Sequence, residues 1–293
     1  MNFLNYENDN NLLDNKIAIV ADIHSNYYLF KRVMKDIKKE KIKTIVFLGD
    51  YITDGFENNK ILNIIKKYNY IIAGNRELSI INYDGNSWDG VEQFKSMLYA
   101  FNDISKKNID FLKKLPIYKI VTLNSKKICL SHITPFNKKD MVYANSFDIF
   151  DKLIDKYNCD IYLFAHTHEA YFTIYKGKMF INSGSVVLPA DTPTSKYGIL
   201  DLSSMTYEQK SISYDFNKLR NYYLNSDYFL NNKEWCNILI HTNETGIDYI
   251  CSFIDFIKEK AMNDGIKIKD TIPNNLWRSA FLDFMKLNNL KIY

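Results

Sequence analysis

The sequence predicts a layered core of strands and helices, of the α/β or α+β class, followed by a helical C-terminal segment. Three observations support this prediction: short apolar runs in the first two thirds of the chain, helix-period segments between the early runs, and a change to helical periodicity after Phe216. The length of 293 residues suits one large domain, or one domain with a sizeable appendage.

Five apolar runs predict buried strands, because each is apolar on both faces and is bounded by turns. They are residues 17–21, 45–49, 70–74, 128–131 and 161–165. Each run is followed directly by a polar side chain that can bind a metal ion, in the order Asp22, Asp50, Asn75, His132 and His166. Ligands gather beyond the carboxyl ends of strands in open sheets, so we expect these side chains to lie together.

Helical periodicity separates the early runs. Apolar residues recur at i, i+3, i+4 and i+7 from Phe30 to Ile37, and the segment Ile61 to Tyr68 predicts a second, shorter helix. Strands that alternate with helices pair in parallel. From Phe172 to Tyr214 the pattern changes to short alternating segments with turn residues, which predicts antiparallel strands that complete a second sheet.

The C-terminal residues predict helices with apolar stripes. One stripe runs through positions 247, 250, 251, 254 and 257, and another through 277, 280, 281, 284 and 287. We expect these stripes to pack against the core or against a partner subunit, which would make the protein a homo-oligomer; the alternative is a lid that narrows substrate access. From Arg220 onward acidic and basic residues are equal in number, which argues against a basic nucleic-acid arm.

Composition places the chain among ordinary globular proteins. The net charge of +4 is compatible with an anionic substrate but does not by itself indicate nucleic-acid binding. The four cysteines show no CxxC spacing and mostly have apolar neighbours, which predicts buried free thiols in a reducing compartment. Met1 to Asn10 does not resemble a signal peptide, and no segment approaches the about 18 apolar residues of a membrane span. We therefore expect a cytoplasmic protein with no membrane partner.

Two pairs of ligand-type residues stand two positions apart, Asp22-x-His24 and His166-x-His168. In extended backbone, positions i and i+2 point to the same side, so each pair could hold one ion. The neighbouring strand ends add a carboxylate able to bridge two ions, an amide oxygen and an imidazole: Asp50, Asn75 and His132. Any one of these residues could be an ordinary polar residue at a turn, but the ordered set favours a metal site. Mixed nitrogen and oxygen ligands suit Mn, Fe, Zn, Co or Ni.

The successive motifs resemble those of the calcineurin-like metallophosphoesterase superfamily, and most of all its small bacterial and archaeal phosphodiesterase branch. The matching blocks are Asp22-x-His24, Gly49-Asp50, Gly74-Asn75-Arg76-Glu77, Ser131-His132, Ala165-His166-Thr167-His168 and Asn182-Ser183-Gly184-Ser185. The resemblance covers about Lys16 to Leu219 and implies an α+β fold, a four-layer αββα sandwich. It divides the chain into a core at 1–219 and a helical C-terminal extension at 220–293.

The resemblance also implies a dinuclear site. The first metal would be held by Asp22, His24, Asp50 and His168, and the second by Asp50, Asn75, His132 and His166. This arrangement separates His166 from His168, and a bridging Asp50 requires the ions to lie about 3.5–4 Å apart.

The implied reaction is hydrolysis of a small phosphodiester or a nucleotide phosphoanhydride. Two divalent ions, Mn foremost and Fe, Zn, Ni or Co otherwise, lower the pKa of a bridging water so that hydroxide is available near neutral pH. They also offset the charge that builds on the phosphoryl group. The expected catalytic residues are Asp50, Asn75 and Arg76, and the expected partner is a small phosphorylated molecule such as a nucleotide.

Arg76 departs from the superfamily pattern, which most often has His at this position. Guanidinium stays protonated and cannot serve as a proton donor, but it can bind a phosphate oxygen. The alternative for Arg76 is a surface ion pair with Glu77 or Asp22. The segment Asn182 to Ser185 would orient substrate or would be a plain hairpin turn.

Two other functions remain open from the sequence. One is a non-catalytic metal-binding regulatory protein derived from the same fold, to which the loss of the usual His gives weight. The other is a nuclease, which the modest and unclustered charge disfavours.

Overall fold

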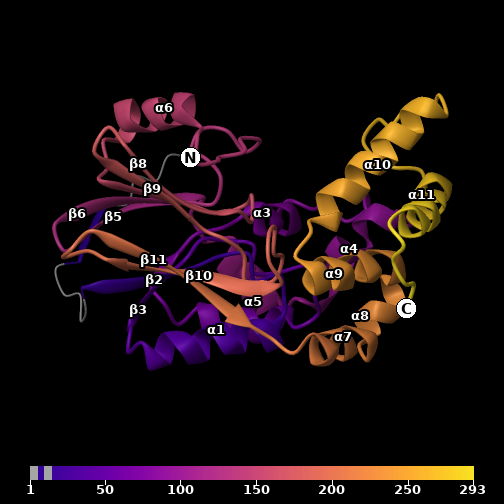
Figure 1. Cartoon of the computed structure of the whole chain (residues 1–293), viewed down its shortest axis with the longest axis horizontal. Coiled ribbons are helices and arrows are strands. Elements are labelled where there is room, and N and C mark those ends of the chain that lie inside the picture. The colour runs from indigo at the N-terminus through magenta and orange to yellow at the C-terminus, as the bar shows by residue number, and fades with distance from the viewer. Residues whose placement is uncertain (1–5, 10–14) are drawn as a thin grey trace.

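Two β-sheets pack face to face, with helices on their outer faces and further helices at one end (Figure 1). The computed structural model describes residues 6–9 and 15–293, so the prediction for Met1 to Asn10 falls largely outside the described residues. The six-stranded sheet has the order β1-β5-β6-β7-β9-β8. Its strands are Tyr6–Asp9 (β1), Tyr118–Leu123 (β5), Lys126–Ser131 (β6), Ile161–Phe164 (β7), Lys178–Ser183 (β9) and Ala170–Tyr175 (β8).

The five-stranded sheet has the order β11-β10-β2-β3-β4. Its strands are Thr206–Ser213 (β11), Thr194–Asp201 (β10), Lys16–Val20 (β2), Thr44–Phe47 (β3) and Tyr70–Ile71 (β4). The three strands β2, β3 and β4 run parallel, as the strand and helix alternation predicts, with Ile17 opposite Thr44 and Val46 opposite Tyr70. All five predicted apolar runs therefore form strands.

The two helices between these parallel strands are α1 (Tyr27–Lys39) and α2 (Asn58–Ile65). The first matches the predicted period. The second begins and ends three residues before the predicted segment. Its first residue, Asn58, accepts from the backbone N–H of Thr53 at 3.2 Å and from the hydroxyl of Ser25, and an apolar period carries no information about such polar contacts.

The strands between Phe172 and Tyr214 correct one prediction. They are antiparallel, but they do not complete a single second sheet. The hairpin β8–β9 joins the six-stranded sheet, where Met179 pairs with Ile161, and the hairpin β10–β11 joins the other sheet, where Gly198 pairs with Ile19. Each hairpin has one strand with alternating exposure, β8 or β11, and one that is almost wholly buried, β9 or β10, so the local pattern cannot specify which sheet each hairpin enters.

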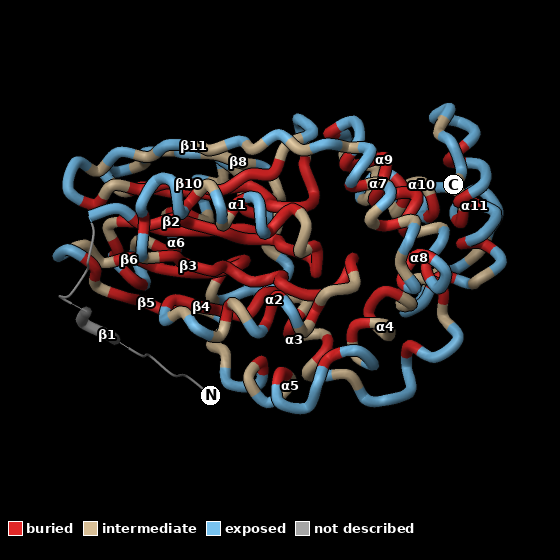
Figure 2. Tube along the Cα trace, turned by 90° about the horizontal axis from the view of Figure 1, so that it is seen from below, coloured by how far each residue is buried: buried red, intermediate tan, exposed pale blue. Residues whose placement is uncertain are grey.

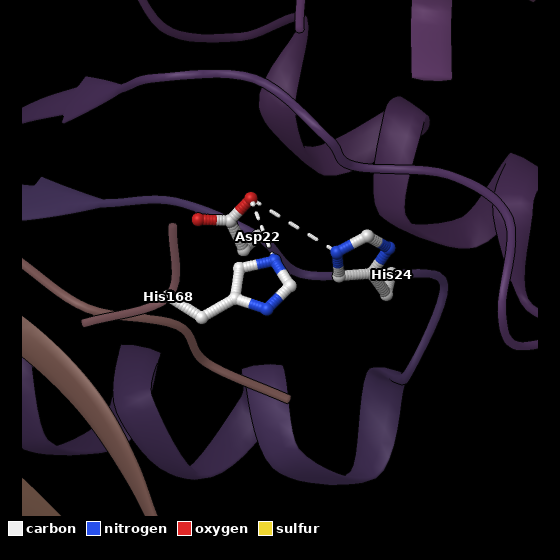
Figure 3. A group of neighbouring side chains, drawn as sticks. All are labelled: Asp22, His24 and His168. Carbon is white, nitrogen blue, oxygen red and sulfur yellow. Dashed lines mark ion pairs between the residues drawn. The ribbon is translucent and has the colours of Figure 1, made fainter. Parts of the chain in front are cut away.

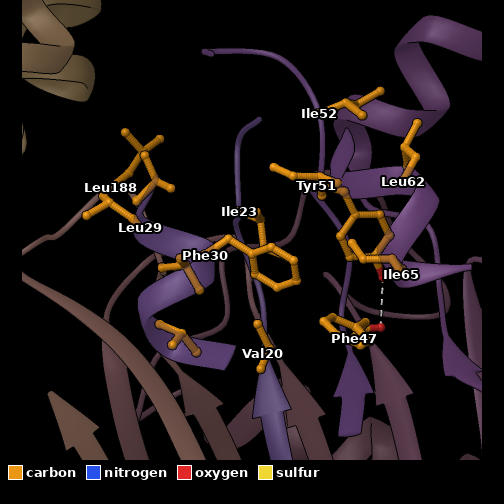
Figure 4. Packing of buried hydrophobic residues seen from close by; sticks show 14 of the residues in the cluster. Val20, Ile23, Leu29, Phe30, Phe47, Tyr51, Ile52, Leu62, Ile65 and Leu188 are labelled. Atoms are coloured by element: carbon orange, nitrogen blue, oxygen red, sulfur yellow. Dashed lines mark hydrogen bonds between the residues drawn. The ribbon is translucent and has the colours of Figure 1, made fainter. Parts of the chain in front are cut away.

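Successive side chains of the central strands are buried on opposite faces of their sheet, which builds four layers. One face of the five-stranded sheet packs under α1 and α2, where Val20, Phe30 and Phe47 lie in the largest apolar cluster (Figure 4). Its other face meets the six-stranded sheet through Ile19 and Leu163, among others. The outer face of the six-stranded sheet is covered by α6 (Phe147–Tyr157). The αββα sandwich is thus confirmed, and the central strands of its two inner layers are almost wholly buried (Figure 2).

Four short helices lie between β4 and β5. They are α3 (Asn75–Ile81), the 3₁₀ helix η1 (Glu92–Phe94), α4 (Lys95–Asp103) and α5 (Lys106–Leu112). The first of them begins at Asn75, so a candidate metal ligand stands in its first turn.

The C-terminal residues are helical, as predicted, and form two groups (Figure 1). The helices are α7 (Phe216–Leu224), α8 (Asp227–Asn231), α9 (Lys233–Thr245), α10 (Tyr249–Asn263) and α11 (Asn274–Leu287). Tyr223, Tyr228 and Leu239 of the first group lie in the same apolar cluster as α1 and α2. The helices α10 and α11 build a separate cluster around Phe253 and Trp277.

The predictions that the apolar stripes and the cysteines are buried are partly correct. Trp277, Ala280, Phe281 and Phe284 are buried, but the α10 face that is buried contains Phe253, Ile257 and Ala261, while Ile247 and Cys251 are exposed. The other three cysteines are buried free thiols. Among the described residues no helix is both long enough and apolar enough to cross a bilayer.

Candidate metal centre

Two groups of three ligand-type side chains lie at the same edge of the two sheets. Asp22, His24 and His168 form one triad, in which the candidate ligand atoms all lie within 4.8 Å of one another (Figure 3). The Nε2 atoms of His168 and His24 stand 3.5 and 3.9 Å from Asp22 Oδ1. Asp50, His132 and His166 form the second triad, within the same limit.

The two triads adjoin each other through His132. Its Nε2 atom lies 3.4 Å from Asp50 Oδ2, 3.9 Å from Asp22 Oδ1 and 3.0 Å from Asn75 Oδ1. The other ring nitrogen, Nδ1, lies 2.7 Å from the carbonyl oxygen of Leu48, which can only accept. The proton on Nδ1 therefore leaves Nε2 free to face the centre. All seven residues expected as ligands are brought together.

The division of the histidines corrects the argument from spacing. His166 and His168 fall in different triads, although residues i and i+2 of an extended strand share one side. The reason is that the backbone here is not extended. Asp22, His24, Asp50, His166 and His168 all have left-handed backbone, with φ between 44° and 72°. Such conformations are uncommon for residues other than glycine and cluster at functional sites.

Two glycines allow the strand-end loops to approach closely. A Cβ on Gly49, which has φ of 98°, would lie 2.5 Å from the backbone nitrogen of Gly74 and 2.9 Å from His132 Nδ1. A Cβ on Gly74 would lie 2.2 Å from Asp50 Oδ1. The Gly-Asp and Gly-Asn motifs are therefore one structural unit, in which Gly74 makes room for the Asp50 carboxylate and Gly49 makes room for the Gly74 backbone and the His132 ring.

Glu77 holds that unit together, and the sequence argument missed this role. Its side chain is fully buried and accepts three backbone hydrogen bonds, from Asp50, Tyr51 and Gly74, each at 2.8 Å. Through these bonds the first turn of α3 is tied to the loop that follows β3. A Glu at the third helical position that accepts from the N-cap N–H is one half of a capping box, and this was the available signal in the sequence, although Gly74 has no side chain to supply the other half.

A second missed residue, Asp54, connects the centre to Arg76. Its buried carboxylate lies 3.2 Å from His24 Nδ1 and 3.1 Å from the Arg76 guanidinium. Trp235 of α9 donates its indole N–H to the same carboxylate at 2.7 Å. The ion pair of Arg76 is therefore neither with Glu77 nor with Asp22, and its acidic partner is buried. Asp54 follows the Gly49-Asp50 motif by only four residues, but a lone Asp in a turn gave no signal.

The segment Asn182 to Ser185 fixes the ligand loops and is not a plain hairpin turn. Asn182 is the penultimate residue of β9, and its amide donates to the carbonyl of Ala165 and the hydroxyl of Thr167. Ser185 donates to the carbonyl oxygen of Asp22. The segment therefore fixes the backbone beside both Asp22-x-His24 and His166-x-His168 through hydrogen bonds.

Electrostatics prepares the centre for cations. Burial favours neutral side chains, but the neighbouring imidazoles, His168 first, outweigh it and hold the pKa of Asp22 below its usual range. Burial also opposes a charged His132, yet Asp50 and Asp22 raise its pKa to about 9. Burial and the positive His132 lower the pKa of His166 to about 4.

The donor set fits divalent metal ions. Both carboxylate oxygens of Asp22 and the Nε2 atom of His24 are buried and have no hydrogen-bond partner among the described residues. Unpartnered buried polar atoms are costly unless a bound ion or water satisfies them. Carboxylate, amide and imidazole donors are those of a transition-metal site.

The fold and these motifs define the class of protein. The model of the calcineurin-like phosphoesterase superfamily domain matches residues 16–205, and the chain belongs to this superfamily. An uncharacterized protein of Methanocaldococcus jannaschii is 27% identical over 225 residues, which cover 71% of this chain and 91% of the relative. Members of the superfamily are generally dimetal-dependent.

Solved structures share the fold. A metallophosphoesterase from Sphaerobacter thermophilus aligns with a TM-score of 0.62 at 15% identity, covering 79% of this chain and 99% of that one. A hypothetical protein from Pyrococcus horikoshii aligns with a TM-score of 0.63 at 15% identity, covering 76% and 97%. The five C-terminal helices, α7 to α11, lie beyond the residues that the superfamily model matches.

The substitution Glu77→Gln tests the clamp between the two loops. An amide has one accepting oxygen, so at least one of the three backbone N–H groups would lose its partner, at a cost of about 1–3 kcal/mol in the free energy of unfolding. We expect a lower melting temperature and weaker metal binding. The matched control is Glu259→Gln on the exposed face of α10, which should change neither quantity. A Glu77→Gln protein with unchanged melting temperature and metal affinity would contradict the assigned role.

Metal binding should release a proton from His132. Its pKa of about 9 means that the metal-free protein carries this proton near neutral pH, and a coordinating imidazole must be neutral. The affinity should therefore rise with pH and level off above about pH 9. Calorimetric titration with Mn near neutral pH, in two buffers of different ionisation enthalpy, measures the protons released. His241→Gln, outside the centre, should leave the number unchanged, and a release of zero would contradict the prediction.

Proposed function

We propose that this protein is a dimetal-dependent hydrolase of small phosphodiesters or nucleotide phosphoanhydrides. The observation that carries the proposal is the pair of adjoining buried triads, Asp22 with His24 and His168, and Asp50 with His132 and His166. Membership of the superfamily supports phosphoester hydrolysis as the reaction class.

The chain's own residues would divide the work between two ions. Asp22, His24 and His168 would hold the first, Asn75, His132 and His166 the second, and Asp50 would serve both. Manganese is the expected metal, and Fe, Zn, Ni or Co also suit these donors. Two bound cations would supply an activated water and charge neutralisation at the phosphoryl group.

The protein itself supplies orientation and positive charge. The carbonyl of Leu48 fixes the ring of His132, and the N–H of Arg76 donates to Asp50 Oδ1 at 2.8 Å, so the carboxylate is held in one direction. The Arg76 guanidinium stays charged, because Asp54 and Asp50 outweigh the effect of burial and raise its pKa further. Part of this positive charge is balanced by Asp54 at 3.1 Å, and the remainder would offset developing negative charge at the phosphoryl group without transferring a proton.

Cavities on two sides of the centre favour substrates with two substituents. One, of about 320 Å³, is lined by Asn75 and His132 on the side of the second triad. The other, of about 310 Å³, is lined by Asp54 and Arg76 on the side of the first. A phosphodiester or a phosphoanhydride carries a group on each side of the reacting phosphorus, whereas a monoester carries one.

The number of bound ions tests the dinuclear site. Protein reconstituted with Mn should contain about two ions per chain by elemental analysis and hydrolyse bis(p-nitrophenyl) phosphate. Asp50→Ala should lose both ions and the activity, because this carboxylate would serve each ion. The exposed Asp255→Ala on α10 is the matched control and should retain both.

Two outcomes would decide against the proposal. A wild-type stoichiometry that stays at one under saturating metal would exclude the dinuclear site. Two bound ions without hydrolysis of any phosphodiester or nucleotide anhydride would favour the non-catalytic regulatory protein.

Arg76 should make the rate depend on the leaving group. A general acid contributes about 10²–10⁴ in rate by protonating the leaving oxygen, and guanidinium cannot do so. We expect activated aryl diesters and anhydrides to react fast and alkyl monoesters slowly, with kcat/KM rising steeply with leaving-group acidity. Arg76→His should improve alkyl relative to aryl substrates, and Arg32→His on the exposed part of α1 should not. Equal wild-type rates for alkyl monoesters and aryl diesters would exclude this role for Arg76.

A further inference from the structure

The cavity on the Arg76 side is built jointly by the core and the C-terminal helices. Asp54, Arg76 and Met97 line it from the core, and Trp235 of α9 and Ile254 of α10 line it from the extension. Its volume of about 310 Å³ stands at the lower end of the range for small-molecule sites, about 300–1,000 Å³. A pocket of this size suits a single ring system.

The cavity adjoins the candidate metal centre through two residues of its wall, Arg76 and Asp54, each of which contacts a candidate ligand. The backbone N–H of Arg76 donates to Asp50 Oδ1 at 2.8 Å, and the Asp54 carboxylate lies 3.2 Å from His24 Nδ1. A group bound in this cavity would therefore lie beside a phosphoryl group held at the two triads.

The polar atoms of the lining are mostly engaged with one another. The Asp54 carboxylate accepts from Trp235 Nε1 at 2.7 Å and from Ser96 Oγ at 3.0 Å, and it pairs with the Arg76 guanidinium at 3.1 Å. Its negative charge is thus neutralised within the wall of the cavity. The described residues in the wall of the cavity therefore offer no unpaired carboxylate, so an uncharged ligand group can bind there without facing an unpaired acid.

The remaining lining suits a flat, uncharged ring. Met97, Ile254 and the buried Trp277 present apolar and aromatic surface. Arg76 also lines the cavity, and its Nη1 atom lies 3.6 Å from the sulfur of Met97. Planar rings stack on guanidinium and indole faces and make favourable contacts with thioether sulfur.

We propose that this cavity binds a planar aromatic group of the substrate, a nucleobase or an aryl ring, while the attached phosphoryl group occupies the metal centre. The proposal rests on the function proposed above and adds its substrate class. It also assigns a role to the C-terminal helices: α9 and α10 select substrates by supplying the outer wall of the ring pocket.

Binding of three phosphorus ligands tests the pocket without requiring turnover. Methylphosphonate and phenylphosphonate have the same charged group and differ in the ring, and adenosine 5′-phosphate carries a nucleobase. For the Mn-loaded wild type, calorimetry should show phenylphosphonate or adenosine 5′-phosphate binding about tenfold or more tightly than methylphosphonate, since the ring surface is buried. The ring that gains affinity identifies the substrate as an aryl ester or a nucleotide.

The variant Ile254→Trp fills the cavity from α10 and should reduce this affinity ratio to near one. A second filling variant, Ile250→Phe, serves if the first does not fold. The control Leu282→Trp adds the same side chain on the exposed face of α11 and should keep the wild-type ratio. A wild-type ratio near one for both ring ligands, or a ratio unchanged in the filled variants, would overturn the pocket.

Hydrolysis of methyl p-nitrophenyl phosphate by the wild type separates the two proposals. Ring-dependent binding without hydrolysis of this or any other diester would reject the catalytic function and keep the pocket as a ligand site. Hydrolysis together with ring-independent binding would keep the phosphodiesterase and reject the pocket.

Discussion

The carboxylate of Glu77 fixes the loops on which the candidate centre depends. It accepts the backbone N–H groups of Asp50, Tyr51 and Gly74, and so joins the end of β3 to the start of α3. The glycines at 49 and 74 make this contact sterically possible, because a Cβ on either would collide with the other loop. The placement of Asp50, Asn75 and Arg76 follows from this one buried interaction, since all three residues stand on the two tied loops.

The second determining contact joins the core to the C-terminal helices. The buried Asp54 carboxylate is shared by His24, Arg76 and the indole of Trp235, a residue far along the chain. A buried charge requires several partners, and here they come from a candidate metal ligand, from the residue that replaces the usual His, and from α9. The extension is therefore part of the candidate site and not only a cover for apolar core surface.

The sequence predicted the strands, the parallel order of β2 to β4 and the set of candidate ligands, because each apolar run ends in a ligand-type residue. The spacing of the residues did not predict how the ligands divide, although the resemblance to the superfamily implied the division that the two triads show. Residues such as His166 and His168 adopt left-handed backbone, which periodicity arguments do not anticipate. The sequence also did not predict which sheet each late hairpin joins, since both hairpins combine one strand of alternating exposure with one buried strand.

The sequence by itself determined the superfamily motifs, the layered core and the chemistry of the donor set, because these depend on local spacing and residue type. Only the tertiary structure decided the roles of Glu77 and Asp54, the partner of Arg76 and the joint cavity between α4, α9 and α10. The physical reason is that the role of a buried carboxylate depends on which donors and cations it contacts. Those partners, Gly74 for one and Trp235 for the other, come together only when distant segments of the chain are folded against each other.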